Sequence, residues 1–212
     1  MEWSLLVGTF FLGCLLAPAA ESLIAKRLPR FGGLPSLPTR ITTAALTGIL
    51  CFAFSLRFGI APYLPAFILL AILGVQLARI DIALHLLPNP LVLLLLVGGI
   101  FLFVTPHLLG QPTGSTLRAA LGAVILFAGY LVLGLISPGG IGMGDVKLAA
   151  PVGLYLGYLG WSQLLYGGLL GFILNGVVTL AVVGRKGRKS TAEVAHGPTM
   201  LGALAATTLF MS

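Results

Sequence analysis

Acidic residues are almost absent from this chain, which carries two aspartates and three glutamates in 212 residues. Charged residues of either sign make up only 8% of the sequence, against about a quarter in an ordinary soluble domain. The shortage comes with 58% hydrophobic residues and a mean hydropathy of +1.09. These values exclude a soluble globular protein and indicate an integral membrane protein embedded in a lipid bilayer. We expect one membrane domain that covers residues 1–212.

Cysteine is also scarce. Cys14 and Cys51 each lie inside an apolar run, and the sequence has no CxxC pair and no spacing typical of zinc ligands. Neither a disulfide framework nor a metal centre is indicated, so both cysteines are interpreted as small apolar side chains that fill space. We expect no metal and no other cofactor.

Basic residues outnumber acidic ones and give the chain a net charge of +7. A basic chain can have a nucleic-acid partner, but here the lysines and arginines flank apolar segments. Their positions indicate membrane topology instead, and we expect no nucleic-acid partner.

Apolar segments of about the length that crosses a bilayer, roughly 17–25 residues, follow one another along the chain. The first is followed, not preceded, by basic residues, which is the reverse of a secretory signal peptide, so we interpret it as a retained span. The sequence predicts an all-α membrane protein, a polytopic bundle of about eight transmembrane helices. The expected spans are 3–24, 41–57, 62–80, 88–105, 117–136, 147–160, 163–184 and 198–211.

The excess of basic residues in cytoplasmic loops predicts the orientation of these spans. With the N-terminus outside, ten of the twelve basic residues lie on or beside inner loops, and only Arg57 and Arg118 fall outside. One long helix over 147–184 would move the basic cluster 185–189 outside, so we expect two helices there, with a turn near 157–161. The expected inner loops are 25–40, 81–87, 137–146 and 185–197.

The two aspartates lie where apolar segments break. Asp81 ends one run and Asp145 opens another, and a carboxylate near hydrocarbon is costly enough to suggest a function. The predicted topology places both on the cytoplasmic side, where a pair of carboxylates suits acid/base hydrolysis. Structural roles are the alternative: Asp81 can pair with Arg79 or cap the next helix, and Asp145 can interact with the dipole of its own helix.

Glycines surround the second aspartate in the segment Gly142-Met143-Gly144-Asp145. Glycine permits positive φ and close approach of another backbone, which is useful if an extended peptide lies beside the carboxylate. Lys147 follows as an anion contact for a substrate or, alternatively, as a lysine that extends toward the inner membrane surface.

Together the two segments resemble the type IV prepilin peptidase family, a branch of the GxGD membrane aspartic proteases. The resemblance rests on Asp81 followed by Leu87-Pro88-Asn89, and on the segment Gly142-Met143-Gly144-Asp145-Val146-Lys147-Leu148. Weaker similarities extend it toward both ends of the chain, at Lys26-Arg27-Leu28-Pro29-Arg30 and at His196-Gly197-Pro198.

The resemblance implies a membrane aspartic endopeptidase that cleaves the short basic leader from type IV prepilin-like precursors at the cytoplasmic face of the cell membrane. It implies Asp81 and Asp145 as catalytic residues and a peptidase core over about 62–184. Gly142, Gly144, Lys147 and Pro88 are expected to shape the site or bind substrate. Long family members carry two CxxC pairs in the first inner loop, associated with N-methylation. Residues 25–40 contain no cysteine, so the resemblance does not support methyl transfer or zinc here.

Three other interpretations compete with this one. A transporter or proton relay would bury its acids in the middle of spans, often within inverted repeats, whereas both aspartates are expected at span ends. A structural membrane subunit leaves the order and spacing of the two segments unexplained. A presenilin-like intramembrane protease pairs its GxGD segment with Tyr-Asp, whereas Ile80 precedes Asp81 here.

Overall fold

The structure is a computed structural model and describes residues 3–31, 33–111, 114–136, 141–186 and 195–211. These residues form eight α-helices and a single turn of 3-10 helix, without strands. The chain divides into two compact units, Met1–Thr116 and Leu117–Ser212.

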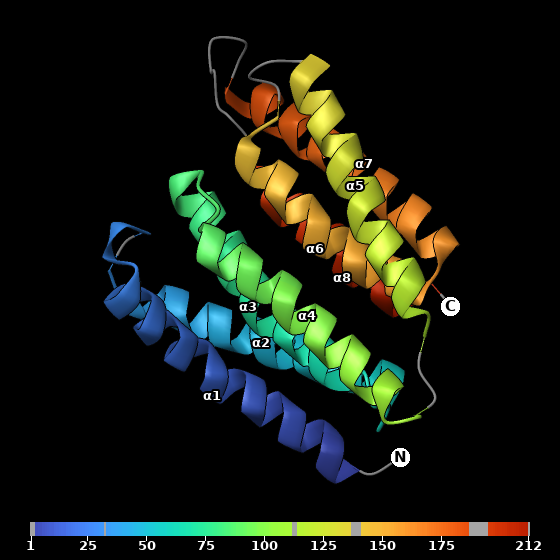
Figure 1. The fold of residues 1–212 in the computed structure, drawn as a ribbon. Coiled ribbons are helices and arrows are strands. Elements are labelled where there is room, and N and C mark those ends of the chain that lie inside the picture. Colours follow the sequence, from blue (N-terminus) through green and yellow to red (C-terminus); the bar gives the residue numbers. More distant parts are fainter. Residues whose placement is uncertain (1–2, 32, 112–113, 137–140, 187–194, 212) are drawn as a thin grey trace. The chain divides into compact units, whose positions relative to one another are not determined.

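The first unit contains α1 (Trp3–Arg27), α2 (Leu37–Phe58), α3 (Leu64–Leu84) and α4 (Asn89–Leu108), with the 3-10 turn Pro29–Phe31 between α1 and α2 (Figure 1). Helix α3 packs against α1, α2 and α4. Twelve of its 21 residues are buried, against five of the 25 residues of α1. Asp81 therefore belongs to the interior helix of this unit.

Small residues allow α1 and α2 to approach closely. A Cβ atom on Gly13 would lie 2.9 Å from the Cα atom of Gly48, and one on Gly48 would lie 2.5 Å from the sulfur of Cys14. Close backbone contact through small residues is the usual way in which helices associate in membranes. Cys51 is fully buried and packs against Gly13. Both cysteines are free thiols.

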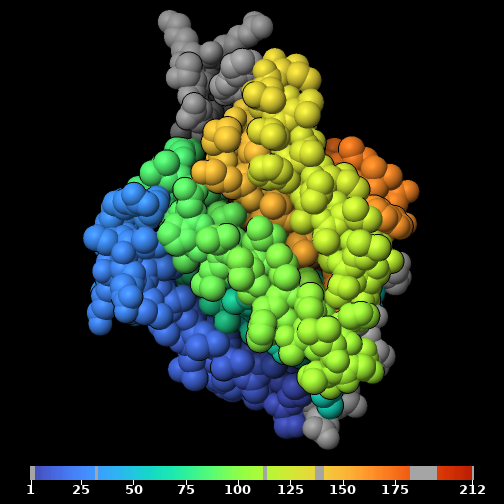
Figure 2. All heavy atoms as spheres, in the orientation of Figure 1, coloured from blue at the N-terminus to red at the C-terminus, as the bar shows by residue number. Residues whose placement is uncertain are grey.

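The second unit contains α5 (Thr116–Ile136), α6 (Met143–Leu159), α7 (Trp161–Lys186) and α8 (Gly197–Phe210). Helix α6 contacts α7 and α8, and it meets α5 where Gly122 lies against the carbonyl of Gly153. Eleven of the 17 residues of α6 are buried. Helix α5, whose atoms are yellow-green to yellow at the surface in Figure 2, exposes large apolar side chains along its length. Helix α6, which carries Asp145, is the interior helix of its unit.

The far end of α6 is tied to α5 by one arginine. Arg118 donates from Nε to the carbonyl of Gly157 at 2.7 Å and from Nη2 to the carbonyl of Tyr158 at 2.9 Å. The last carbonyls of a helix lack partners within it and carry partial negative charge. Arg118 neutralises them, which gives this basic residue a structural role apart from the inner loops.

The helices agree with the predicted spans to within a few residues, and α6 and α7 are separate helices that meet at Gly160. Within the described residues, six helices, α1 to α5 and α7, are long and apolar enough to cross a membrane, while α8 is a shorter apolar helix of 14 residues. The protein is thus an all-α, polytopic membrane protein. Three predicted spans were four residues too short at one end: α2 begins at Leu37, α3 continues to Leu84 and α6 begins at Met143.

Candidate active site

Asp81 lies in the last turn of α3 and not in the loop after it. Its side chain is buried, with 5% of the residue exposed. The helix ends just beyond, where His85 adopts a left-handed conformation (φ 51°) and donates its backbone N–H to the Asp81 carbonyl at 2.8 Å. The expected inner loop 81–87 is therefore only about half loop, because Ile82 to Leu84 continue the helix. The packing of α3 fixes the position of the Asp81 backbone.

Pro88 opens the next helix. It is buried and stands at the N-cap of α4, where its carbonyl accepts the N–H groups of Leu91 and Val92 at 3.0 and 3.1 Å. The fixed φ of proline suits a helix start, so Pro88 sets the direction in which α4 leaves the turn that follows Asp81.

A buried polar cluster ties α1, α2 and α3 together at this end of the first unit. Glu21 is 1% exposed and accepts hydrogen bonds from Thr43 Oγ1 at 2.5 Å and Arg40 Nε at 3.3 Å. Its charge also acts on Arg79, which donates to Gln76 at 3.1 Å. Sequence reasoning missed this cluster, although an acid inside an apolar segment is itself a signal.

Asp145 lies in the first turn of α6, with Gly142 at the N-cap. This position favours a carboxylate, because the free N–H groups at a helix start carry partial positive charge. A Cβ atom on Gly142 would lie 3.2 Å from the Asp145 Oδ2 atom, so any side chain at 142 would crowd the carboxylate. Gly142 has a φ of −69°, which any residue can adopt. Positive φ therefore does not account for a glycine at this position, whereas the space beside the carboxylate does.

The remaining predicted residues of the second unit lie along the same helix start. Gly144 is in the first turn of α6, partly exposed, and Lys147 follows in the next turn with its side chain exposed. Gly139 and Gly140, two further glycines that precede Asp145 in the sequence, lie outside the described residues. So does most of the basic cluster after α7, from residue 187 onward.

Each aspartate lies at the basic end of its own unit. In the first unit, the Glu21–Arg40 ion pair brings the end of α1 beside the start of α2, and Arg79 precedes Asp81 by two residues. In the second unit, α7 starts beside the end of α6 and runs back to finish at Arg185 and Lys186 (Figure 1). Asp81 belongs to the first unit and Asp145 to the second, and their pairing stays a prediction.

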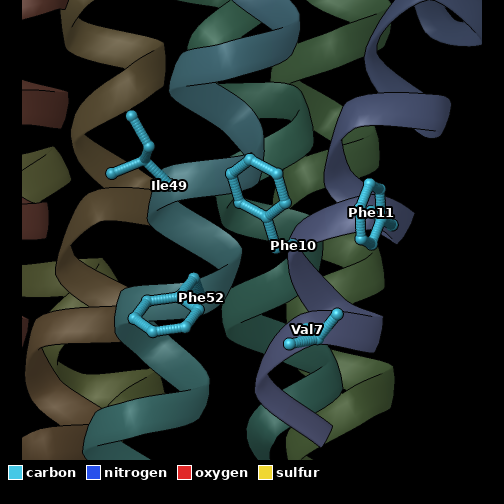
Figure 3. A pocket seen from close by; sticks show the side chains of 5 residues that line it. All are labelled: Val7, Phe10, Phe11, Ile49 and Phe52. Carbon is cyan, nitrogen blue, oxygen red and sulfur yellow. The ribbon is translucent and has the colours of Figure 1, made fainter. Parts of the chain in front are cut away.

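An apolar groove of about 370 Å³ lies between α1 and α2, and none of the predicted site residues lines it (Figure 3). Its lining offers no polar or nucleophilic atom, so it cannot support acid/base chemistry. The residues that line the groove are Val7, Phe10, Phe11, Ile49 and Phe52.

Three or more His, Cys, Asp or Glu side chains, the usual protein ligands of a metal ion, do not come together anywhere in the described part of the chain. The chemistry available from the predicted residues is that of two carboxylates.

Comparison with known proteins gives consistent matches. The model of the type IV leader peptidase family matches residues 66–180, just over half of the chain, and this range includes both aspartates. A protein of Xanthomonas campestris pv. campestris named prepilin leader peptidase/N-methyltransferase is 31% identical over 190 residues, covering 85% of this chain and 62% of its own length. A protein of the same name from Bacillus subtilis (strain 168) is 34% identical over 113 residues, covering 53% of this chain and 43% of its own length.

The chain thus spans 62% or less of the length of these relatives. No solved structure matches it significantly.

Proposed function

The chain belongs to the type IV leader peptidase family, and on this premise we propose that it is a membrane aspartic endopeptidase that removes the short basic leader from type IV prepilin-like precursors. The observation that carries the proposal is that the family match covers both aspartates together with the segments that follow or precede them. The names of the relatives point to the same substrate class.

Asp81 and Asp145 form the proposed catalytic pair. Two nearby carboxylates do not both ionise easily, so they share a proton and titrate as a unit. The ionised member takes a proton from water, while the protonated member polarises the scissile carbonyl. Direct sharing of the proton needs oxygens about 3 Å apart, or a bridging water. Lys147, Pro88, Gly142 and Gly144 would shape the surroundings or contact the substrate backbone.

We place the active site at the cytoplasmic face of the cell membrane. Support comes from the basic residues at the Asp81 end of the first unit and the Asp145 end of the second, because basic residues accumulate on the cytoplasmic side. A leader retained inside by its own positive charge would be cut there. The apolar helix of the precursor would lie in the bilayer beside the spans and hold the scissile bond at the surface, so positioning would contribute much of the rate.

Methyl transfer, the second activity in the names of both relatives, is not part of the proposal. Residues 25–40 contain no cysteine, and the chain covers only part of those longer proteins. A membrane transporter with paired acids remains the competing function, and both aspartates lie at helix ends instead of mid-helix, which favours the peptidase.

The test is cleavage of a purified prepilin that carries a basic leader, by the purified chain in detergent, with the new N-terminus read by mass spectrometry. We expect removal of the leader with or without a metal chelator, since a carboxylate pair needs no metal. Absence of cleavage by a folded protein would contradict the proposed function. Loss of cleavage with chelator, restored by zinc, would contradict the two-aspartate mechanism. A tag placed after Lys186 should be found in the cytoplasm, and a periplasmic tag would overturn the topology.

A further inference from the structure

Three aromatic rings from different helices of the second unit meet at the Asp145 end. Tyr130 of α5 stacks on Phe172 of α7 with ring centroids 4.9 Å apart. His196, at the N-cap of α8, lies 5.6 Å from the Tyr130 ring and 5.5 Å from the Phe172 ring. Tyr130 is 2% exposed. The mechanism above uses none of these residues.

The hydrogen bonds of His196 determine which of its nitrogens carries the proton. The Thr199 hydroxyl donates to the His196 carbonyl at 2.7 Å, so its oxygen is left as the acceptor for His196 Nδ1 at 3.4 Å. A proton on Nδ1 makes Nε2 of the neutral ring an acceptor. The Tyr130 hydroxyl, 3.0 Å from Nε2, is therefore the donor in that hydrogen bond.

His196 is neutral in this arrangement. Its burial lowers the pKa of the imidazole below the ordinary value of 6.5, because burial disfavours the charged form. The Tyr130 proton is thus directed to histidine, and the lone pairs of the Tyr130 oxygen remain available to accept a hydrogen bond from another group.

The charge of Asp145 acts on the Tyr130 hydroxyl. Helix α6 also packs against α5 near this hydroxyl: Val146, the residue after Asp145, lies against Gly134, one turn beyond Tyr130, with 3.7 Å between Val146 Cγ2 and a Cβ built on Gly134. Among the described side chains at this end of the unit, the titratable groups are Tyr130, Asp145, Lys147 and His196. Helix α7 contributes the uncharged Phe172.

We infer that the Tyr130–His196 pair holds Asp145 as the protonated member of the aspartate pair, which leaves Asp81 as the base. A protonated Asp145 can donate to the Tyr130 oxygen, directly or through one water. The negative charge of an ionised Asp145 would instead be repelled by the lone pairs of that oxygen. Tyr130 and His196 are positioning residues in this scheme. The inference rests on the proposed function for its catalytic meaning and assigns the two roles within it.

The proton movements balance over one cycle. Asp81 takes a proton from water as the water oxygen bonds to the scissile carbonyl carbon, and Asp145 gives its proton to the carbonyl oxygen, forming a gem-diol. As the carbon–nitrogen bond breaks, Asp81 gives its proton to the leaving nitrogen and one hydroxyl of the diol returns a proton to Asp145. The products are a carboxylic acid and an amine, and the aspartates end as they began.

The scarcity of aspartate allows a direct test that does not depend on peptidase activity. The full chain is labelled with ¹³C at the aspartate carboxyl carbons, and Asp81→Asn leaves Asp145 as the only labelled residue, because the sequence has two aspartates. The titration of Asp145 is then followed by ¹³C NMR in detergent. In this background we expect Tyr130→Phe to move the midpoint to lower pH by about half to one unit, the effect of losing one hydrogen bond to the protonated form.

Two histidine variants refine the test. His196→Phe should move the midpoint further in the same direction, because the Tyr130 hydroxyl loses its acceptor and turns to donate to the Asp145 carboxylate. His196→Gln keeps an acceptor at that position and should move it less than His196→Phe. Phe172→Leu removes a stacked ring without changing any polar group. It should lower thermal stability and leave the midpoint unchanged.

The inference is overturned if Tyr130→Phe and His196→Phe, in folded protein, leave the midpoint where it was or raise it. It is equally overturned if Phe172→Leu moves the midpoint as much as they do, since the effect would then be structural. Cleavage of a prepilin by the unlabelled native chain is measured separately. Cleavage without the NMR shifts rejects the inference and keeps the function, whereas the shifts without cleavage reject the function and leave the Asp145 environment as inferred.

Discussion

The two predicted catalytic aspartates are held in opposite ways. Asp81 lies in the last turn of a long helix that is buried on most of its surface, so its backbone is fixed by the packing of the whole first unit. Asp145 lies in the first turn of a helix that begins directly after Gly142, and it is partly exposed. Because one carboxylate depends on packing and the other on a local helix start, changes near Asp81 should act mainly on stability and changes near Asp145 mainly on rate.

The largest effect is expected from removal of either carboxylate, and here the two aspartates should behave alike. Asp81→Asn and Asp145→Asn should each reduce cleavage by about four orders of magnitude or more, since members of a catalytic unit cannot replace one another. The double variant should be no worse than either single one. Leader removal from a purified prepilin measures this, with membrane insertion checked in parallel. Near-normal cleavage by one single variant would show that the carboxylates do not act as a pair.

The contrast predicts a stability effect on the Asp81 side. Leu77 is fully buried one turn before Asp81, and Leu77→Ala should cost about 2–5 kcal/mol of unfolding free energy by leaving a cavity. Ile82→Ala, next to Asp81 but 64% exposed, is the matched control and should cost much less. Unfolding in detergent measures both. If the fraction of Leu77→Ala that remains folded cleaved far more slowly per molecule, packing would not be its main effect.

On the Asp145 side the expected effect is on rate. Gly142→Ala places a methyl group about where it meets the Asp145 carboxylate, and a displaced catalytic group costs on the order of 10- to 100-fold in rate. Gly202→Ala is the control, since a Cβ there meets nothing within 4 Å. kcat for leader removal and the thermal midpoint should be measured together. A Gly142→Ala protein that cleaves normally, or that loses stability instead of rate, would contradict the comparison.

The smallest effect concerns His196. Burial lowers its pKa in the folded state, so below about pH 6.5 the unfolded chain binds more protons than the folded one and stability falls as the pH falls. Above that pH the contribution of neutral His196 is fully present. The thermal midpoint of the native chain should therefore decline more steeply toward acid pH than that of His196→Gln. Parallel curves for the two proteins would show that His196 is not desolvated.

Much of the fold follows from the pattern of apolar runs. The runs and the Gly-Trp break near residue 160 predict the helices to within a few residues, because hydrophobic length and turn residues are local signals. The end of α3 was placed too early, since a charged residue was taken as the end of the span. Asp81 is instead tolerated inside the last turn, and the helix stops four residues later through the left-handed His85, which no sequence pattern here indicates.

The candidate site was likewise predictable only in part. Both aspartates and the nearby glycines are visible in the sequence because acids are rare and glycines cluster there. The polar contacts between helices of each unit are not. Tyr130 and His196 are hydrogen-bonded although they are 66 residues apart, and Glu21 of α1 accepts hydrogen bonds from Arg40 and Thr43 of α2. Such contacts depend on how helices cross, which composition and spacing do not determine.

The hydrogen bonds of Arg118 to the end of α6 also have a consequence for biogenesis. In the predicted topology Arg118 lies on the outer side, at the start of α5, and the carbonyls that accept from it belong to residues 39 and 40 positions later in the chain. The guanidinium has these partners only when α6 lies beside α5. Correct placement of α5 would become secure only when α6 inserts, so the second unit is expected to assemble as a helix pair.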